Sequence, residues 1–268
     1  MTPPPARLHF FLGGADLEME AIAGLLARHA PGRYTDKGLA WGAGISDYAD
    51  EIRAALGRGE TPVLVELADD LPSDAIDRAR TIVVDHHGPR AGADRPSSLE
   101  QVFRLLGRPR HEWTREYQLI AANDIGHVAA MRALQPPATA EEMREIRARD
   151  RRAQGLTEAE ERAAEAAVAE RAVTGRLTAV TVPGNRASAV ADRMEPLLGG
   201  PGFDALMVAM ADEMAVFADG DTIRWLSERV PGSWSGGALP GRGFWGAHLP
   251  PGPERDRLIA GLRARLAD

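Results

Sequence analysis

An aspartate and two adjacent histidines follow a short apolar segment and are the residues of this chain best suited to chemistry. Residues 81–84 are Thr-Ile-Val-Val, and Asp85, His86 and His87 come directly after them. Two adjacent histidines after a buried strand cannot both face the same way, so one could bind a metal ion while the other meets a ligand. The aspartate can accept the second N–H of an imidazole and hold that ring in one tautomer. Histidine pairs also occur in ordinary loops, so the triplet alone does not establish a metal site.

Carboxylates stand at comparable places in other segments. Asp16 and Glu18 follow a first apolar run, Glu66 follows a second, and Asp124 interrupts a mostly apolar helical stretch. A buried carboxylate is costly when it is unpaired, so the last of these needs a reason. The chain has no cysteine, which leaves histidine and carboxylate as the ligands for any metal ion. Oxygen ligands with one imidazole favour Mn²⁺ or Mg²⁺ over a structural zinc.

The elements that must position these residues alternate between strands and helices. Apolar runs predict strands, and amphipathic stretches between them predict helices. This alternation indicates an α/β fold with a parallel sheet and helices on both faces, whose ligand crevice lies beyond the carboxyl ends of the strands. The predicted strands are residues 8–12, 62–67 and 81–84, and the predicted helices are residues 16–29, 46–56, 72–79, 98–106 and 112–133.

The second half of the chain predicts a helical connector and a smaller α/β lobe. Residues 139–172 are rich in Ala, Glu and Arg, and Thr157 with Glu160 fits a capping box within them. We interpret this stretch as a solvated connector, with a partner-binding helix as the alternative. Further strands are expected at residues 177–182, 205–211 and 213–218, and helices at 188–198 and 222–229. The predicted domains are therefore 1–137, 138–173 and 174–268.

A glycine-rich segment at residues 233–248 could bring its backbone close to a ligand. Arg242 could clamp a phosphate or carboxylate through its planar fork, or it could be a surface residue on a flexible glycine turn. The aromatic residues of this segment could stack on a nucleobase or anchor the core of the lobe. These aromatic residues are Trp234, Phe244 and Trp245.

The composition excludes several classes of protein. The 268 residues are 44% hydrophobic and 26% charged, which is typical of a globular protein with a proper core. A net charge of −7 argues against a protein that coats long nucleic acid. No apolar run reaches the roughly 18–20 residues of a membrane helix. We therefore expect a cytoplasmic protein, not bound to a membrane, with a loose, proline-rich stretch at residues 1–7.

Residues 83–88 (Val-Val-Asp-His-His-Gly) resemble the DHH phosphoesterase superfamily. The resemblance extends to the acidic pair Asp16 and Glu18 after the first strand, to Glu66 after an upstream strand and to Asp124 in a downstream helix. That superfamily includes RecJ-type exonucleases, nano-RNA and phosphoadenosine phosphatases, cyclic dinucleotide phosphodiesterases and manganese-dependent inorganic pyrophosphatases. The resemblance implies a DHH domain, a DHHA1-like second lobe and one or two Mn²⁺ or Mg²⁺ ions. It also implies hydrolysis, in a cleft between the lobes, of a small phosphorylated substrate such as a nucleoside phosphate, cyclic dinucleotide or short oligonucleotide. The sequence does not decide whether two chains form a homodimer.

The resemblance also implies roles for individual residues. Asp85, His86 and His87 would be catalytic, with Asp85 orienting His86 and His87 meeting a substrate phosphate. The implied metal ligands are Asp16, Glu18, Glu66, His86 and Asp124, and the implied substrate-binding residues are His87, Gly236, Gly237, Arg242 and His248.

The chain departs from the superfamily pattern at several positions. Leu12 stands where the family usually has a histidine, Glu18 and Glu66 replace aspartates, and the glycine-rich segment lacks its usual histidine. The loss of an imidazole should weaken one of two metal sites. His127, about one helical turn after Asp124, could replace it or could be a core or capping residue. These departures support an alternative, a non-catalytic sensor that binds a nucleotide, while the retained carboxylates favour an enzyme. A third reading is coincidence in a generic doubly wound protein.

Overall fold

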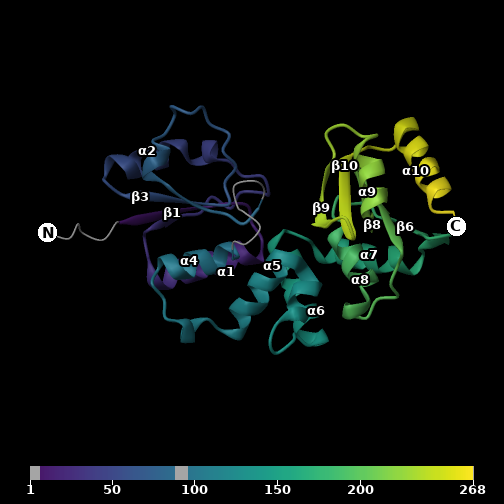
Figure 1. The fold of residues 1–268 in the computed structure, drawn as a ribbon, viewed down its shortest axis with the longest axis horizontal. Coiled ribbons are helices and arrows are strands. Elements are labelled where there is room, and N and C mark those ends of the chain that lie inside the picture. Colours follow the sequence, from purple (N-terminus) through teal and green to yellow (C-terminus); the bar gives the residue numbers. More distant parts are fainter. Residues whose placement is uncertain (1–6, 88–95, 268) are drawn as a thin grey trace. The chain divides into compact units, whose positions relative to one another are not determined.

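The computed structural model describes residues 7–87 and 96–267, which divide into two compact units (Figure 1). The first unit spans Met1–Gln154 and the second spans Gly155–Asp268. The two helices expected as one connector divide between them. Helix α6 (Ala140–Ala153) belongs to the first unit and α7 (Glu158–Ala169) to the second. Both helices begin with a capping box, at Thr139 and at Thr157.

A four-stranded parallel sheet is the centre of the first unit. Its strands lie in the order β2-β1-β3-β4, and all pair in parallel. Their apolar runs are nearly continuous, as expected for parallel strands that are covered on both faces. The strands are β1 (Leu8–Leu12), β2 (Tyr34–Thr35), β3 (Thr61–Val65) and β4 (Ile82–Val84).

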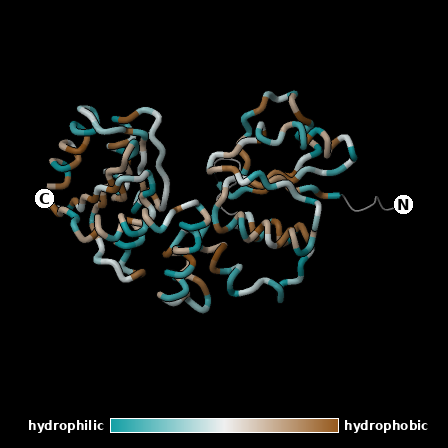
Figure 2. The backbone as a smooth tube through the Cα atoms, turned by 180° about the vertical axis from the view of Figure 1, so that it is seen from behind, coloured by the Kyte–Doolittle hydropathy of each residue, from teal (hydrophilic) through white to brown (hydrophobic). Residues whose placement is uncertain are grey.

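Helices cover both faces of this sheet. Helix α2 (Ala49–Gly57) lies on one face, and α1 (Leu17–His29) and α4 (Ser98–Leu105) lie on the other (Figure 1). Hydrophobic residues gather along the strands and along the helix faces beside them (Figure 2). On the α2 face, Phe11 and Leu64 pack with Tyr48 and Ile52 in one buried cluster. The predicted α/β class with helices on both faces is confirmed.

Three parts of the first unit differ from the sequence-based prediction, and the first is strand β2, which was not predicted. Residues 72–77 form turns instead of a helix, and only Arg78–Arg80 forms a 3-10 turn. The reason is that the Arg78 guanidinium binds the backbone carbonyls of residues 71–73 and the Asp69 carboxylate, which fixes the segment as a loop. Helix α5 (Arg115–Ala133) is broken inside, because Gly126 and His127 have non-helical backbone angles.

The second unit is built on a six-stranded mixed sheet in the order β5-β6-β7-β8-β10-β9. Strands β6 (Leu177–Thr181) and β7 (Ala205–Ala209) are parallel, and the other pairs are antiparallel. Helices α7 and α8 (Ser188–Met194) pack on a core that includes Val180 and Val208. A separate core contains residues of α9 (Gly220–Ser227) and α10 (Pro253–Arg265). The predicted smaller α/β lobe is confirmed as a fold.

The glycine-rich segment forms a β-hairpin that was not predicted from the sequence. Its strands are β9 (Trp234–Ala238) and β10 (Arg242–His248), and β10 also pairs with β8 (Glu213–Asp219). The opposite edge strand is β5 (Ala172–Thr174). Gly236 lies opposite Phe244, and a Cβ on this glycine would approach the Phe244 ring to 2.9 Å. The glycines therefore make room for aromatic rings across the hairpin.

Within residues 7–87 and 96–267, no helix is both long and apolar enough to cross a lipid bilayer. Gly88 and residues 1–6 of the proline-rich stretch lie outside the described residues.

Candidate metal centre

The carboxyl ends of the parallel strands bring the predicted residues to one edge of the first sheet. Glu66 comes directly after β3, and Asp85, His86 and His87 come directly after β4. Beyond β1, Asp16 caps the N-terminus of α1, where its carboxylate accepts a hydrogen bond of 2.7 Å from the Met19 N–H. Glu18 lies in the first turn of the same helix.

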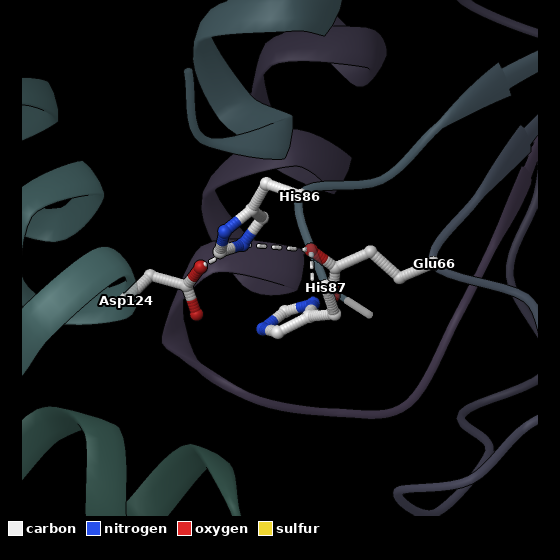
Figure 3. Close-up of side chains that lie close together, drawn as sticks. All are labelled: Glu66, His86, His87 and Asp124. Atoms are coloured by element: carbon white, nitrogen blue, oxygen red, sulfur yellow. Dashed lines mark ion pairs between the residues drawn. The ribbon is translucent and has the colours of Figure 1, made fainter. Parts of the chain in front are cut away.

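Asp124 approaches this edge from α5 and completes a cluster with Glu66, His86 and His87 (Figure 3). Each of these four residues offers a ligand atom within 4.8 Å of the others. His86 Nε2 lies against Asp124 Oδ2, 3.3 Å from Glu66 Oε1 and 3.7 Å from Glu18 Oε2. One imidazole nitrogen thus faces three carboxylate oxygens that come from three different segments.

The atoms at the centre of this cluster are buried and lack well-formed hydrogen bonds. Glu18 Oε2, Glu66 Oε1, His86 Nε2 and Asp124 Oδ2 are four of the six such side-chain atoms among the described residues. Buried polar groups normally have a partner, because leaving one unsatisfied costs about 1–3 kcal/mol and more for a charge. Because four such atoms, three of them carboxylate oxygens, converge on one point, we infer that a positively charged ligand binds there. The donor set of three carboxylates and one imidazole fits a divalent cation such as Mn²⁺ or Mg²⁺.

The protonation of the cluster agrees with this interpretation. Burial, reinforced by Asp124 and Glu66, raises the pKa of Asp16 to about 7. Burial and the same two carboxylates raise the pKa of Glu18 well above its ordinary value. Burial opposes charge on His86, but its close ion pairs with Asp124 and Glu66 prevail and raise its pKa to about 10. Protons therefore offset the carboxylate charge when no cation does so.

Glu66 is held in a strained backbone conformation. Its φ is +52°, in the left-handed region that residues other than glycine rarely adopt, and its N–H donates to the Val84 carbonyl at 2.8 Å. Gly13 packs closely beside it, since a Cβ there would lie 2.7 Å from the Glu66 carbonyl oxygen. Strain of this kind costs of order 1–3 kcal/mol and is typical of functional sites. The Glu66 side chain points toward His86 (Figure 3).

Asp85 contacts His87 instead of His86, the partner expected from the sequence. Its Oδ1 accepts a hydrogen bond of 2.7 Å from the His87 N–H and lies 3.4 Å from His87 Nδ1. Hydrogen bonding to Asp85 outweighs burial and raises the pKa of His87. The His87 side chain is 55% exposed, whereas that of His86 is 7% exposed. The two rings thus take different roles, one inside the cluster and one at its surface.

A buried polar network beside the cluster was not predicted from the sequence. Arg147 of α6 donates to Asn123 Oδ1 at 3.0 Å and to Asp150 Oδ2 at 2.8 Å. Asp150 Oδ1 also accepts the Leu17 N–H of α1 at 3.4 Å. The network joins the helices that carry Glu18 and Asp124. The only signal in the sequence was the Asn-Asp pair in an apolar helix, because the partners lie far apart along the chain.

The imidazole that the superfamily usually has at position 12 is not replaced by His127. Leu12 is fully buried at the end of β1. The break in α5 removes the helical geometry that would place His127 one turn from Asp124, and His127 Nδ1 lies 3.2 Å from Arg147. Among the described side chains, the cluster of ligand atoms includes neither residue.

The remaining predicted residues belong to the second unit. Gly236 and Gly237 are in β9, and Arg242 and His248 are the first and last residues of β10. Arg242 donates to the Phe203 carbonyl at 3.1 Å, and its guanidinium lies 4.3 Å from the centre of the Phe203 ring.

The aromatic residues of the hairpin differ in exposure. Trp245 is fully buried, so it anchors the core, whereas Trp234 and Phe244 are partly exposed.

Comparison with known proteins gives structural likenesses only. The sequence matches no family model, and no curated protein matches it significantly. A pGpG-specific phosphodiesterase, PggH from Vibrio cholerae, is 11% identical with a TM-score of 0.41, and the match covers 96% of this chain and 98% of that one.

Two RecJ structures are also similar. RecJ from Thermus thermophilus with Mn²⁺ is 13% identical with a TM-score of 0.45, and the match covers 97% of this chain and 51% of that one, so the chain spans about half of this protein. An exonuclease RecJ bound to manganese is 13% identical with a TM-score of 0.43, over 97% of this chain and 89% of that one. Both matches combine low sequence identity with coverage of nearly all of this chain.

Proposed function

We propose that the first unit carries a divalent-metal-dependent phosphoesterase site, and that the chain is a divergent DHH phosphoesterase with a DHHA1-like second unit. The observation that carries the proposal is the convergence of Glu18, Glu66, His86 and Asp124 through atoms that are buried and unsatisfied. A cluster of like charges is costly to bury, and a bound cation removes that cost.

The metal ligands in this proposal are Glu18, Glu66, His86 and Asp124, with Asp16 beside them. Their chemistry fits Mn²⁺ or Mg²⁺, and with no histidine at position 12 the donor set serves one ion better than two. A divalent cation there would supply Lewis acidity, which activates water and offsets the negative charge on a phosphoryl group.

In this proposal His87 meets the substrate. Its Nδ1 faces Asp85 and Glu66, and its other ring nitrogen points away from Glu66 (Figure 3). Hydrogen bonding to Asp85 raises the pKa of His87, and the charged ring that this stabilises can donate to a phosphoryl oxygen. The same proton can pass to a leaving oxygen. In this role Asp85 orients His87, and His86 holds the metal.

The substrate we propose is a small phosphorylated compound, such as a nucleoside phosphate, a cyclic dinucleotide or a short oligonucleotide. Two observations support a small substrate, the net charge of −7 and the position of His87 at the surface of a largely buried cluster. We further propose that the second unit contributes to substrate binding through Gly236, Gly237, Arg242 and His248.

The test is turnover of a panel of small phosphoesters and phosphodiesters with Mn²⁺, with Mg²⁺ and with EDTA. The His86→Ala variant should lose metal-dependent turnover, and so should the double variant Asp85→Ala with His86→Ala. The matched control His111→Ala, at an exposed histidine of the same unit, should keep it. Metal-dependent nucleotide binding without turnover would favour a nucleotide sensor over an enzyme. Equal turnover in the His86→Ala variant and the unaltered protein would reject the proposed metal site.

A further inference from the structure

The most exposed large apolar residue among those described is Trp41, whose exposed fraction is 87%. It lies between β2 and the 3-10 turn Ile45–Tyr48, in a segment with the sequence Gly38-Leu39-Ala40-Trp41-Gly42-Ala43-Gly44. Within the described part of the chain, its ring takes part in no aromatic pair or cation–π contact. Its side chain therefore adds little to the packing of the core.

Backbone contacts fix both ends of this segment to the strand edge that carries the metal ligands. Leu39 forms a parallel bridge with Gly14 and accepts the Ala15 N–H at 2.8 Å. Gly44 forms a parallel bridge with Ala68, whose N–H donates to the Ala43 carbonyl at 2.9 Å. The first contact lies just before Asp16 and the second just after Glu66. Trp41 is therefore held in place by both of the segments that supply these carboxylates.

Two glycines after β1 allow a close approach on both sides. A Cβ on Gly13 would lie 2.7 Å from the Glu66 carbonyl oxygen, and a Cβ on Gly14 would lie 2.7 Å from the Trp41 Cα. The glycine pair thus brings the backbone of Glu66 on one side and that of Trp41 on the other into close contact along the sheet edge. The backbone of Trp41 is placed as closely as that of Glu66, although its side chain is in water.

The order of the strands gives the span between Trp41 and the metal ligands. The segment with Trp41 follows β2, Asp16 follows β1, Glu66 follows β3 and His86 follows β4, and these strands are adjacent and parallel. At about 4.8 Å per strand, Trp41 stands roughly 10–15 Å from the strand ends that carry Glu66 and His86. A bare phosphate cannot bridge this span, whereas a nucleoside phosphate or dinucleotide is long enough to do so.

We propose that Trp41 is a nucleobase-stacking residue, which binds the base of a substrate whose phosphate lies at the metal centre. The inference rests on the proposed function, because it uses the metal centre as the point where the phosphate is held. An indole face stacks on any base and needs no sequence-specific hydrogen bonds. A stacked base contributes about 1–3 kcal/mol, which corresponds to a roughly 5- to 150-fold change in binding.

The experiment compares the unaltered protein with Trp41→Ala and Trp41→Phe on two substrates, a linear dinucleotide and a base-free phosphodiester. Trp41→Ala should lower kcat/KM for the dinucleotide about 5- to 150-fold, mainly through KM, and leave the base-free diester unchanged. Trp41→Phe should keep most of the activity, because a phenyl ring also stacks. Val173→Ala is the matched control, since Val173 is an exposed apolar residue of the second unit. Equal losses on both substrates, or no loss on either, would overturn the proposal.

Nucleotide binding separates this inference from the proposed function. If the unaltered protein turns over neither substrate, the phosphoesterase proposal fails, and quenching of tryptophan fluorescence by the dinucleotide with Mn²⁺ then tests the stacking alone. Quenching that is lost in Trp41→Phe, which retains the other four tryptophans, supports the role of Trp41. No quenching, or equal quenching in Trp41→Phe, rejects it.

Discussion

Replacement of Glu18 by glutamine should stabilise the protein without metal and abolish its stabilisation by metal. The Glu18 side chain is fully buried on α1. One carboxylate oxygen accepts the Leu99 N–H at 3.0 Å, and the other is unsatisfied, 3.7 Å from His86 Nε2. Glutamine has the same shape and can keep the bond to Leu99, but it brings no negative charge into the cluster.

The magnitude follows from these contacts. At pH 8 without metal, the variant should gain about 1–3 kcal/mol, because glutamine is neutral as it stands, whereas the buried Glu18 carboxyl either carries an uncompensated charge or must take up a proton. With Mn²⁺ at 100 times its Kd, the unaltered protein should gain about 2.7 kcal/mol, because the ion binds only the folded state. In a unit of this size 1 kcal/mol shifts Tm by roughly 2–4 °C, so Mn²⁺ should raise Tm by about 5–11 °C.

Thermal unfolding followed by circular dichroism, in EDTA and in excess Mn²⁺, measures both effects. In EDTA the Tm of Glu18→Gln should lie above that of the unaltered protein, and the rise in Tm that Mn²⁺ gives the unaltered protein should be lost in the variant. The control Glu145→Gln, at an exposed position of α6, should behave as the unaltered protein in both buffers. An equal Mn²⁺ shift in Glu18→Gln and in the unaltered protein would refute the assignment of Glu18 to the metal centre.

Three further predictions concern pH, the buried network and the second unit. Asp16 has a pKa of about 7 in the folded protein and 3.8 as a free side chain, so between these pH values the folded state binds an extra proton. Tm in EDTA should therefore fall from pH 4 to pH 7, and a rise over this range would contradict the raised pKa of Asp16. Arg147→Met should cost about 3–5 kcal/mol in urea unfolding, since it removes the guanidinium that donates to the buried Asp150 carboxylate, and a loss below 1 kcal/mol rejects this role. Trp245→Ala should cost about 3–5 kcal/mol, measured in the same way, because it empties a fully buried site, and a smaller loss means that the core closes around the gap.

The first unit could be predicted well because its pattern is local. Near-continuous apolar runs marked β1, β3 and β4, and each polar residue just after a strand end lies at one edge of the sheet. The turn at residues 72–77 was missed because it depends on Arg78, whose bonds to three carbonyls do not appear in a hydrophobic pattern.

The glycine-rich hairpin was missed for a different reason. Glycine inside a strand normally argues against that strand. In this hairpin the glycines lie opposite aromatic residues, with Gly236 across from Phe244 and Gly246 across from Trp234. The sequence shows the glycines and the rings but not the pairing that makes them compatible.

The individual roles at the site depend on tertiary contacts. The expectation that Asp85 would orient His86 relied on the superfamily pattern, whereas the geometry joins Asp85 to His87. Arg147 and Asp150 could not be found from spacing, because their partners Asn123 and Leu17 are distant in the sequence. The left-handed backbone of Glu66 likewise has no signal in residue type.

The most direct test of the metal centre is a Mn²⁺ titration followed by electron paramagnetic resonance, which measures the free ion. The unaltered protein should bind one Mn²⁺ per chain in a saturable way, Asp124→Asn should lose most of this affinity, and the exposed control Glu145→Gln should keep it. Unchanged binding in Asp124→Asn, or no binding by the unaltered protein, would contradict the claim that these unsatisfied side chains form a cation site.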